Sequence, residues 1–165
     1  ALGWTGANAV KWLHRITVLS QPHQGFFMDK VYRVFQKGEP SDSGEVVTGI
    51  RLKSIITQPL VGETVPMGDV AIMGAAYAGE VRIAAVEVSL DEGQSWAPAA
   101  FFGPDEPFSW RQWQLVWSPP APGDYTIWAR ATDAEGRRQP MDADWNVLGY
   151  GNNGVREHGV QIQVV

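Results

Sequence analysis

The sequence predicts an all-β domain built as a sandwich of two sheets. Three observations support this: short runs of alternating apolar residues, turn sequences between them, and little helical periodicity. No repeat with a period of about 20–50 residues is visible, which disfavours propellers and solenoids. The predicted strands of the sandwich are residues 54–58, 69–77, 82–89, 97–101, 111–117, 123–131 and 159–165.

The part of the chain before the sandwich is less regular. Residues 10–19 (VKWLHRITVL) predict a strand with Trp12, Ile16 and Val18 on or near one face. Residues 21–38 are apolar but irregular, which indicates a connecting segment lying across a core, and a polar surface loop follows it.

Alternation and turn chemistry support the later strands. In residues 111–117, Trp113, Leu115 and Trp117 share one face of the predicted strand, and two glutamines and Val116 share the other. This strand therefore has one face that points into the core of the sandwich and one that points outward.

Two turns are specified by their residue types. In residues 89–96 (SLDEGQSW), Asp91 can accept bonds from backbone amides and Gly93 can adopt a positive φ, which predicts a hairpin. After the proline-rich residues 119–122, Tyr125 occupies a place where a sandwich often uses a tyrosine hydroxyl to hold a corner.

Composition argues against several classes of function. The net charge of −5 and the pI near 5.1 argue against a nucleic-acid partner, because phosphate binding needs a basic surface. No apolar run approaches the roughly 20 residues of a membrane-spanning helix. The lack of cysteine excludes thiolate metal ligands and a cysteine nucleophile. We interpret the chain as a fragment or processed product, because its first residues contain neither a start methionine nor a signal-peptide pattern.

The residue types that commonly form metal or catalytic sites have structural roles as the better explanation in this sequence. His14, His23 and His158 lack the local spacing of metal ligands, so no metal site is predicted. Glycosidase chemistry needs two carboxylates across a cleft, and Asp91 is better explained by its turn. Residues 89–96 also match the sialidase Asp-box, but a sialidase propeller needs several copies and this chain has one.

The eight tryptophans have two interpretations. They could form a sugar-binding platform, or they could be divided between the core and a subunit interface. The second interpretation is favoured, because interface cores are enriched in Trp and Tyr.

Two segments resemble a known enzyme family. Residues 3–16 (GWTGANAVKWLHRI) resemble the Gly-x-x-Gly-x-x-x-Val-Lys-Trp-Leu-x-Arg-Ile/Val motif of the sulfite oxidase and assimilatory nitrate reductase family. Residues 145–153 (WNVLGYGNN) resemble the family's Trp-Asn-x-x-Gly stretch, and the intervening segments follow the family's order. The resemblance covers nearly the whole chain.

The resemblance implies an immunoglobulin-like β-sandwich of about seven strands with an irregular N-terminal extension. It divides the chain into the tail of a molybdopterin-binding domain (1–19), a connecting segment (20–50) and an immunoglobulin-like domain that forms a homodimer (51–165). The expected partners are therefore a second copy and the upstream molybdopterin domain of the same parent chain. An extracytoplasmic location is also favoured by the resemblance.

The resemblance also implies which residues contact the molybdenum cofactor (molybdopterin). In the family the loop equivalent to residues 6–11 contacts the pterin, which assigns cofactor binding to Gly6, Asn8, Ala9 and Lys11. A lysine ammonium suits a phosphate, and small residues allow backbone amides to approach it.

Two departures limit what this chain does alone. Family members bind molybdenum through one cysteine, so the metal ligand lies upstream and no catalytic residue is assigned here. Sulfite oxidases carry an arginine where this chain has Leu148, and a charge-assisted bond to an oxyanion contributes about 1.5–3 kcal/mol. Arg156 is a candidate replacement. Oxygen-atom transfer is therefore expected of the parent enzyme more firmly than sulfite as its substrate.

Two alternatives stand beside this prediction. An autonomous immunoglobulin-like module that binds a carbohydrate or peptide through exposed tryptophans would leave the segment 3–16 unexplained. A small hydrolase lacks a nucleophile and base at a recognisable spacing.

Overall fold

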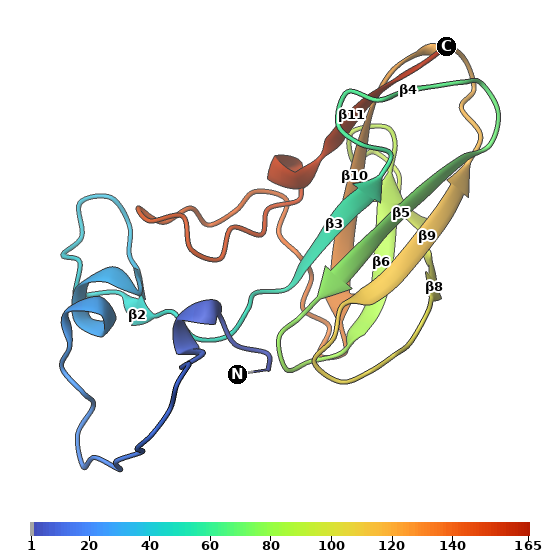
Figure 1. Ribbon diagram of the computed structural model, residues 1–165. Coiled ribbons are helices and arrows are strands. Elements are labelled where there is room, and N and C mark those ends of the chain that lie inside the picture. The colour runs from blue at the N-terminus through green and yellow to red at the C-terminus, as the bar shows by residue number, and fades with distance from the viewer. Residues whose placement is uncertain (1) are drawn as a thin grey trace.

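The structure, a computed structural model that describes residues 2–165, is a β-sandwich of two sheets (Figure 1). One sheet has four strands in the order β3-β5-β9-β8: β3 (Lys53–Gln58), β5 (Val70–Tyr77), β9 (Arg111–Trp117) and β8 (Ala100–Phe102). The other has five strands in the order β4-β11-β10-β6-β7: β4 (Thr64–Val65), β11 (Val160–Val164), β10 (Gly123–Asp133), β6 (Ile83–Ser89) and β7 (Ala97–Pro98). The predicted all-β, immunoglobulin-like fold is confirmed.

The hydrophobic core lies between the sheets and is centred on Trp113. The alternation predicted in β9 is confirmed, because Trp113 is fully buried and Leu115 and Trp117 pack against the same core. Apolar burial contributes about 25 cal/mol per Å², which selects the inward face of each strand. The other large core residues are Val65, Val70, Ile72, Val86, Val88, Ile127, Val160, Ile162 and Val164.

A buried glutamine connects the two sheets near the N-terminal segment. The Oε1 atom of Gln139 accepts hydrogen bonds from the Ser54 amide of β3 at 2.8 Å and the Ala131 amide of β10 at 3.2 Å. Buried backbone amides need acceptors, and here one side chain supplies both. This bond pair holds the start of β3 against β10.

Both predicted turns are confirmed. Asp91 accepts hydrogen bonds from the Ser89 hydroxyl at 2.8 Å and from the Ser95 amide at 2.9 Å, and Gly93 has φ +87°. The Tyr125 hydroxyl donates to the Ala121 carbonyl at 2.8 Å and closes the corner before β10.

Two predicted strands differ from the structure. Residues 10–19 form no strand, and their side chains are all exposed, so the predicted strand is wrong. A strand needs a neighbouring backbone to pair with, and no other part of residues 2–165 pairs with this segment. Residues 97–101 divide at Ala99, because β7 pairs with β6 in one sheet and β8 pairs with β9 in the other.

The N-terminal segment lies beside one end of the sandwich (Figure 1). It contains the short helical turns η1 (Gly6–Asn8) and η2 (Phe27–Val31), and a small hairpin of β1 (Arg33–Val34) and β2 (Glu45–Val46). Among residues 2–165, no helix has the length and apolar character needed to cross a bilayer.

We expect Gly74→Ala to destabilise the protein. A Cβ atom at this position would overlap the Trp113 ring and the Ile55 carbonyl oxygen, and both are held by the sheet. Overpacking of this kind lowers the free energy of unfolding by about 1–3 kcal/mol. Urea denaturation measures the change.

Gly6→Ala is the matched control, because a Cβ atom there meets nothing within 4 Å. We expect it to change the free energy of unfolding by less than about 0.5 kcal/mol. Equal changes in the free energy of unfolding for Gly6→Ala and Gly74→Ala would contradict the conclusion that Gly74 packs closely against Trp113.

We expect the turn at Asp91 to make stability depend on acid pH. Hydrogen bonds from the Ser95 hydroxyl, and next from the Ser95 amide and Ser89 hydroxyl, lower the pKa of Asp91 from 3.8 to about 2. Because the folded-state pKa lies below the unfolded one, this stabilisation is present above the unfolded pKa and is lost as pH falls through about 2. In urea titrations between about pH 4 and 2, Asp91→Asn should lose stability less steeply than the wild type. Identical slopes would show that the carboxylate bonds do not stabilise the fold.

Candidate functional site

The residues predicted to contact the cofactor lie in and after η1. The Asn8 side-chain amide donates to the Thr5 hydroxyl at 2.9 Å and to the Val47 carbonyl at 3.1 Å. The Thr5 amide donates to the Thr48 carbonyl at 2.8 Å. The Nδ2 atom of Asn8 is thus used to hold the turn against the segment that enters β3.

The outer side of this turn is open. A Cβ atom on Gly6 would meet no atom within 4 Å, and Ala9 and Lys11 are exposed. No carboxylate in the described chain forms an ion pair with Lys11. An exposed ammonium beside open backbone fits the phosphate end of a pterin cofactor.

The metal end of such a cofactor has no matching ligands in the part of the chain that the structure describes. Residues 2–165 contain no group of three His, Cys, Asp or Glu side chains able to hold a metal ion. His14 and His23 are exposed, and His158 is half-buried beside the Asn152 carbonyl at 3.5 Å. Gly6, Ala9 and Lys11 therefore fit a phosphate contact. The described residues do not supply a set of molybdenum ligands.

The segment after η1 exposes several large apolar side chains to solvent. Trp12 is 96% exposed, Val18 is 94% exposed and Ile16 is 77% exposed. A contiguous exposed apolar surface commonly marks a contact with another domain or protein. Each of these side chains is thus exposed, and its burial would need a surface outside residues 2–165.

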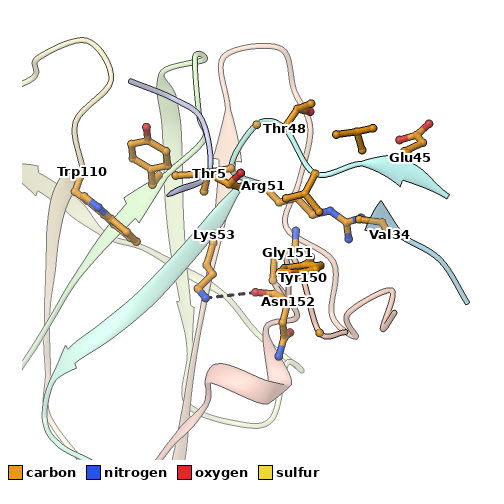
Figure 2. A pocket seen from close by; sticks show the side chains of 17 residues that line it. Thr5, Val34, Glu45, Thr48, Arg51, Lys53, Trp110, Tyr150, Gly151 and Asn152 are labelled. Atoms are coloured by element: carbon orange, nitrogen blue, oxygen red, sulfur yellow. Dashed lines mark hydrogen bonds between the residues drawn. The ribbon is translucent and has the colours of Figure 1, made fainter. Parts of the chain in front are cut away.

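A cavity of about 430 Å³ lies where the N-terminal segment, the start of β3 and residues 149–153 meet (Figure 2). Its wall includes the aromatic side chains Tyr77, Trp110 and Tyr150, with 5.3 Å between the ring centroids of Tyr77 and Trp110. The cationic side chains that line it are Arg51 and Lys53.

Asn146 of the predicted Trp-Asn-x-x-Gly segment shapes one side of this cavity. It is buried, its Oδ1 atom accepts from the amides of Leu148 at 3.2 Å and Tyr150 at 3.1 Å, and its Nδ2 atom donates to the Tyr150 carbonyl. Gly149 follows with φ +71°. The asparagine of this segment therefore acts by folding a turn that presents Tyr150 to the cavity.

Arg156 was the candidate to replace the arginine that sulfite oxidases carry at the position of Leu148. The structure does not place Arg156 in this cavity. The Nη1 atom of Arg156 lies 2.5 Å from both carboxylate oxygens of Asp142, and its guanidinium lies 5.6 Å from the centre of the Trp128 ring. Arg156 does not line the cavity, whereas Arg51 and Lys53 do. Sequence reasoning missed this pair because only the folding of residues 149–153 against β3 distinguishes them from other cations at a strand end.

The outer face of the four-stranded sheet is uncharged over its centre. Opposite neighbours on this face are Met73 and Gln114, and beside them Ala71 and Val116. Alternation along each strand assigns the same face to a set of apolar and neutral side chains. We call this set the uncharged face: Ile55, Gln58, Ala71, Met73, Ala75, Ala100, Phe102, Gln112, Gln114 and Val116. Lys53, the first residue of β3, lies on the same side of the sheet but beyond this set.

The outer face of the five-stranded sheet is different. Arg130 of β10 pairs with Glu87 of β6 at 2.9 Å and lies over the Trp96 ring at 3.8 Å, and the exposed Asp124 adds a further charge. Because the centres of protein interfaces are depleted in charged side chains, the uncharged face is the better interface of the two.

Comparison with known proteins identifies the family. Residues 45–164 match the Mo-co oxidoreductase dimerisation domain, which begins at β2 and includes the whole sandwich. The chain belongs to this family. Mo-co denotes the molybdenum cofactor, so the family resemblance expected from the sequence is confirmed.

The relatives of this chain are larger proteins, and the chain matches only part of each. The chain is 33% identical to mitochondrial sulfite oxidase of Rattus norvegicus over 99% of its own length and 32% of that protein. It is 28% identical to the NADH nitrate reductase of Solanum lycopersicum over 92% of its length and 19% of that protein. The chain thus spans about a third or less of the length of these relatives.

A solved structure has the same fold as this dimerisation domain together with its N-terminal segment. The sulfane dehydrogenase SoxCD of Paracoccus pantotrophus superposes with a TM-score of 0.80 over 99% of this chain and 45% of that chain, at 23% identity.

We expect Asn146→Ala to loosen the cavity wall. The change removes three hydrogen bonds from a buried turn, and each unsatisfied buried group costs about 1–3 kcal/mol. Hydrogen exchange of the amides of residues 148–152 should accelerate about tenfold or more, while amides in β10 keep their protection.

Asn146→Asp is the matched variant. It keeps the Oδ1 acceptor for the Leu148 and Tyr150 amides and removes the donor to the Tyr150 carbonyl, so its effect should be intermediate. Unchanged exchange in both variants would mean that the turn is held by other contacts.

Proposed function

We propose that this chain dimerises a larger molybdenum-cofactor oxidoreductase through the uncharged face of its four-stranded sheet. The observation that carries the proposal is the contrast between the two sheets: one outer face is apolar and neutral, and the other carries Arg130, Glu87 and Asp124. Membership of a dimerisation family supplies the partner, a second copy of the same chain.

A two-fold interface on this face would be isologous, so the same residues on both copies would meet. Gln114 of β9 lies between Met73 of β5 and Ala100 of β8, near the middle of the face. Neutral amides there can pair across the axis, and the neighbouring alanines Ala71, Ala75 and Ala100 allow close approach of the two sheets.

We further propose that the N-terminal segment belongs with an upstream domain. Residues 1–19 would complete the molybdopterin domain, residues 20–50 would connect it, and residues 51–165 would form the dimerisation domain. The exposed Trp12, Ile16 and Val18 support this division, because their burial needs a surface that the sandwich does not provide.

The proposed cofactor contacts are Gly6, Asn8, Ala9 and Lys11. Gly6 and Ala9 leave the backbone accessible, Lys11 supplies a positive charge, and Asn8 positions the turn. When bound upstream, the molybdenum cofactor supplies oxygen-atom transfer. Residues of this chain bind and position, and none of them is assigned to the reaction itself.

The autonomous carbohydrate- or peptide-binding module is not favoured. Residues 45–164 match a dimerisation family, for which the partner is a second copy of the chain. The Asp91 turn, which resembles a sialidase box, is fully explained by its bonds to Ser89 and Ser95.

We expect Gln114→Glu in the full-length protein to weaken the dimer. The variant would bury one carboxylate from each copy near the two-fold axis, and an unpaired buried carboxylate costs several kcal/mol. The dissociation constant of the dimer should rise about 100-fold or more, which sedimentation velocity across a concentration series measures.

Gln161→Glu makes the same chemical change on the outer face of the five-stranded sheet, at an exposed position of β11. We expect this control to remain dimeric. Dissociation of the control with retention of the Gln114→Glu dimer would assign the interface to the other sheet, and a monomeric wild type would reject dimerisation by this chain.

A further inference from the structure

Residues 3–5 pair with the backbone of the segment that enters β3. The Ile50 amide donates to the Gly3 carbonyl at 3.1 Å. The Thr5 amide donates to the Thr48 carbonyl at 2.8 Å, and an isolated antiparallel bridge lies between these two bonds. The start of the chain is thereby held beside the end of the sandwich at which β5 ends (Figure 1).

The side chain of Trp4 adds a bond to the sandwich itself. Its indole Nε1 atom donates to Oε1 of Glu80 at 2.8 Å, a contact between residues 76 positions apart in the sequence. Glu80 lies in the connection between β5 and β6. Within residues 2–165 this carboxylate forms no ion pair, so the bond to the indole is the contact that the structure gives it.

Two glycines allow this close contact. A Cβ atom on Gly3 would lie 2.9 Å from Glu80 Cγ. A Cβ atom on Gly79 would lie 3.0 Å from the Ile50 carbonyl oxygen and 3.3 Å from the Gly3 carbonyl oxygen. Their φ angles of +81° and +63° also favour glycine. The backbones at positions 3, 50 and 79 therefore meet with no side chain between them, which fixes where the segment lies on the sandwich.

The docked segment leads directly into the turn that carries the proposed cofactor contacts. The Thr5 carbonyl accepts from the Asn8 amide at 3.0 Å, and the Gly6 carbonyl accepts from the Ala9 amide at 3.0 Å. Trp4 precedes Gly6 by two peptide units, and consecutive Cα atoms are about 3.8 Å apart. A displacement of Trp4 is therefore passed on to the turn.

The other side of the turn gives it no comparable support. Residues 10–19 are all exposed, and within residues 2–165 no backbone pairs with them in a sheet. The place of the turn relative to the sandwich thus depends on the bonds of Asn8 and on the docking of residues 3–5.

We propose that Trp4 and Glu80 are positioning residues for the cofactor contacts at Gly6, Ala9 and Lys11. The bond from the indole to the carboxylate holds the turn at one place on the sandwich, so that Gly6 and Ala9 stay available to the cofactor. This role rests on the proposed cofactor contacts, and it makes the connection between β5 and β6 part of their support.

The test is the rate of cofactor release from the full-length protein with its cofactor bound, followed by the fluorescence of the released pterin after oxidation. Trp4→Phe keeps an aromatic ring and removes the donor, and Glu80→Ala removes the acceptor. We expect each variant to speed release about three- to tenfold, the effect of losing one partly exposed hydrogen bond. The double variant should release the cofactor no faster than either single variant, because both changes remove the same bond.

Glu80→Gln keeps an acceptor oxygen for the indole, so it should release the cofactor at the wild-type rate. Glu135→Ala is the matched control: Glu135 is an exposed carboxylate that lines the same surface hollow as Trp4 and Glu80, but it pairs with Arg137 at 3.2 Å. Hydrogen exchange at residues 5 and 50 should accelerate in Trp4→Phe and Glu80→Ala alone, while amides in β10 keep their protection.

Wild-type release rates in both Trp4→Phe and Glu80→Ala would overturn the positioning role, as would equal acceleration in Glu80→Gln or in Glu135→Ala. Lys11→Met separates this role from the proposed cofactor contacts. Faster release in Lys11→Met with no change in Trp4→Phe would reject the positioning role alone. Faster release in Trp4→Phe with no change in Lys11→Met would keep it and reject the contact at Lys11.

Discussion

Trp113 fills the centre of the sandwich because its neighbour across the sheet, Gly74, has no side chain. This contact orients β5 and β9 together: with Trp113 and Ile72 buried inside, Gln114 and Met73 must point outward. A shift of one residue in register would place glutamines in the core and tryptophans in solvent. The uncharged face therefore follows from the packing of a single indole ring.

The outer face of the four-stranded sheet and the N-terminal segment are suited to different contacts. The outer face of the four-stranded sheet is neutral over its centre, which suits association with an identical copy. The N-terminal segment has neither paired backbone nor buried side chains over residues 10–19, so its stability must come from contacts outside the sandwich. Asn8 and Thr5 fasten its first turn to residues 47 and 48, which couples that outside surface to the start of β3.

The cavity lies where these parts meet. Gln139 holds the start of β3 against β10, Asn146 folds the turn that carries Tyr150, and Gly151 allows Arg51 to pass. The side chains of Gln139 and Asn146 satisfy backbone groups that burial would otherwise leave unpaired. Their combined effect is to position Arg51 and Lys53 at one cavity wall although no carboxylate of the described chain pairs with them.

Local pattern alone determined much of the sandwich: the alternation of Trp113, Leu115 and Trp117, the Asp91 turn and the Tyr125 corner all depend on residues close in sequence. Its resemblance to a molybdenum-cofactor family was also readable, because motifs 3–16 and 145–153 are contiguous. Tertiary structure decided what depends on distant partners. Residues 10–19 have the alternation of a strand but no neighbouring strand to pair with. Arg156 forms an ion pair with Asp142, and residues 97–101 divide between the two sheets. The pairing of Arg51 and Lys53 in one cavity likewise required the loop at 149–153, about a hundred residues away, because long-range contacts leave no local periodicity in a sequence.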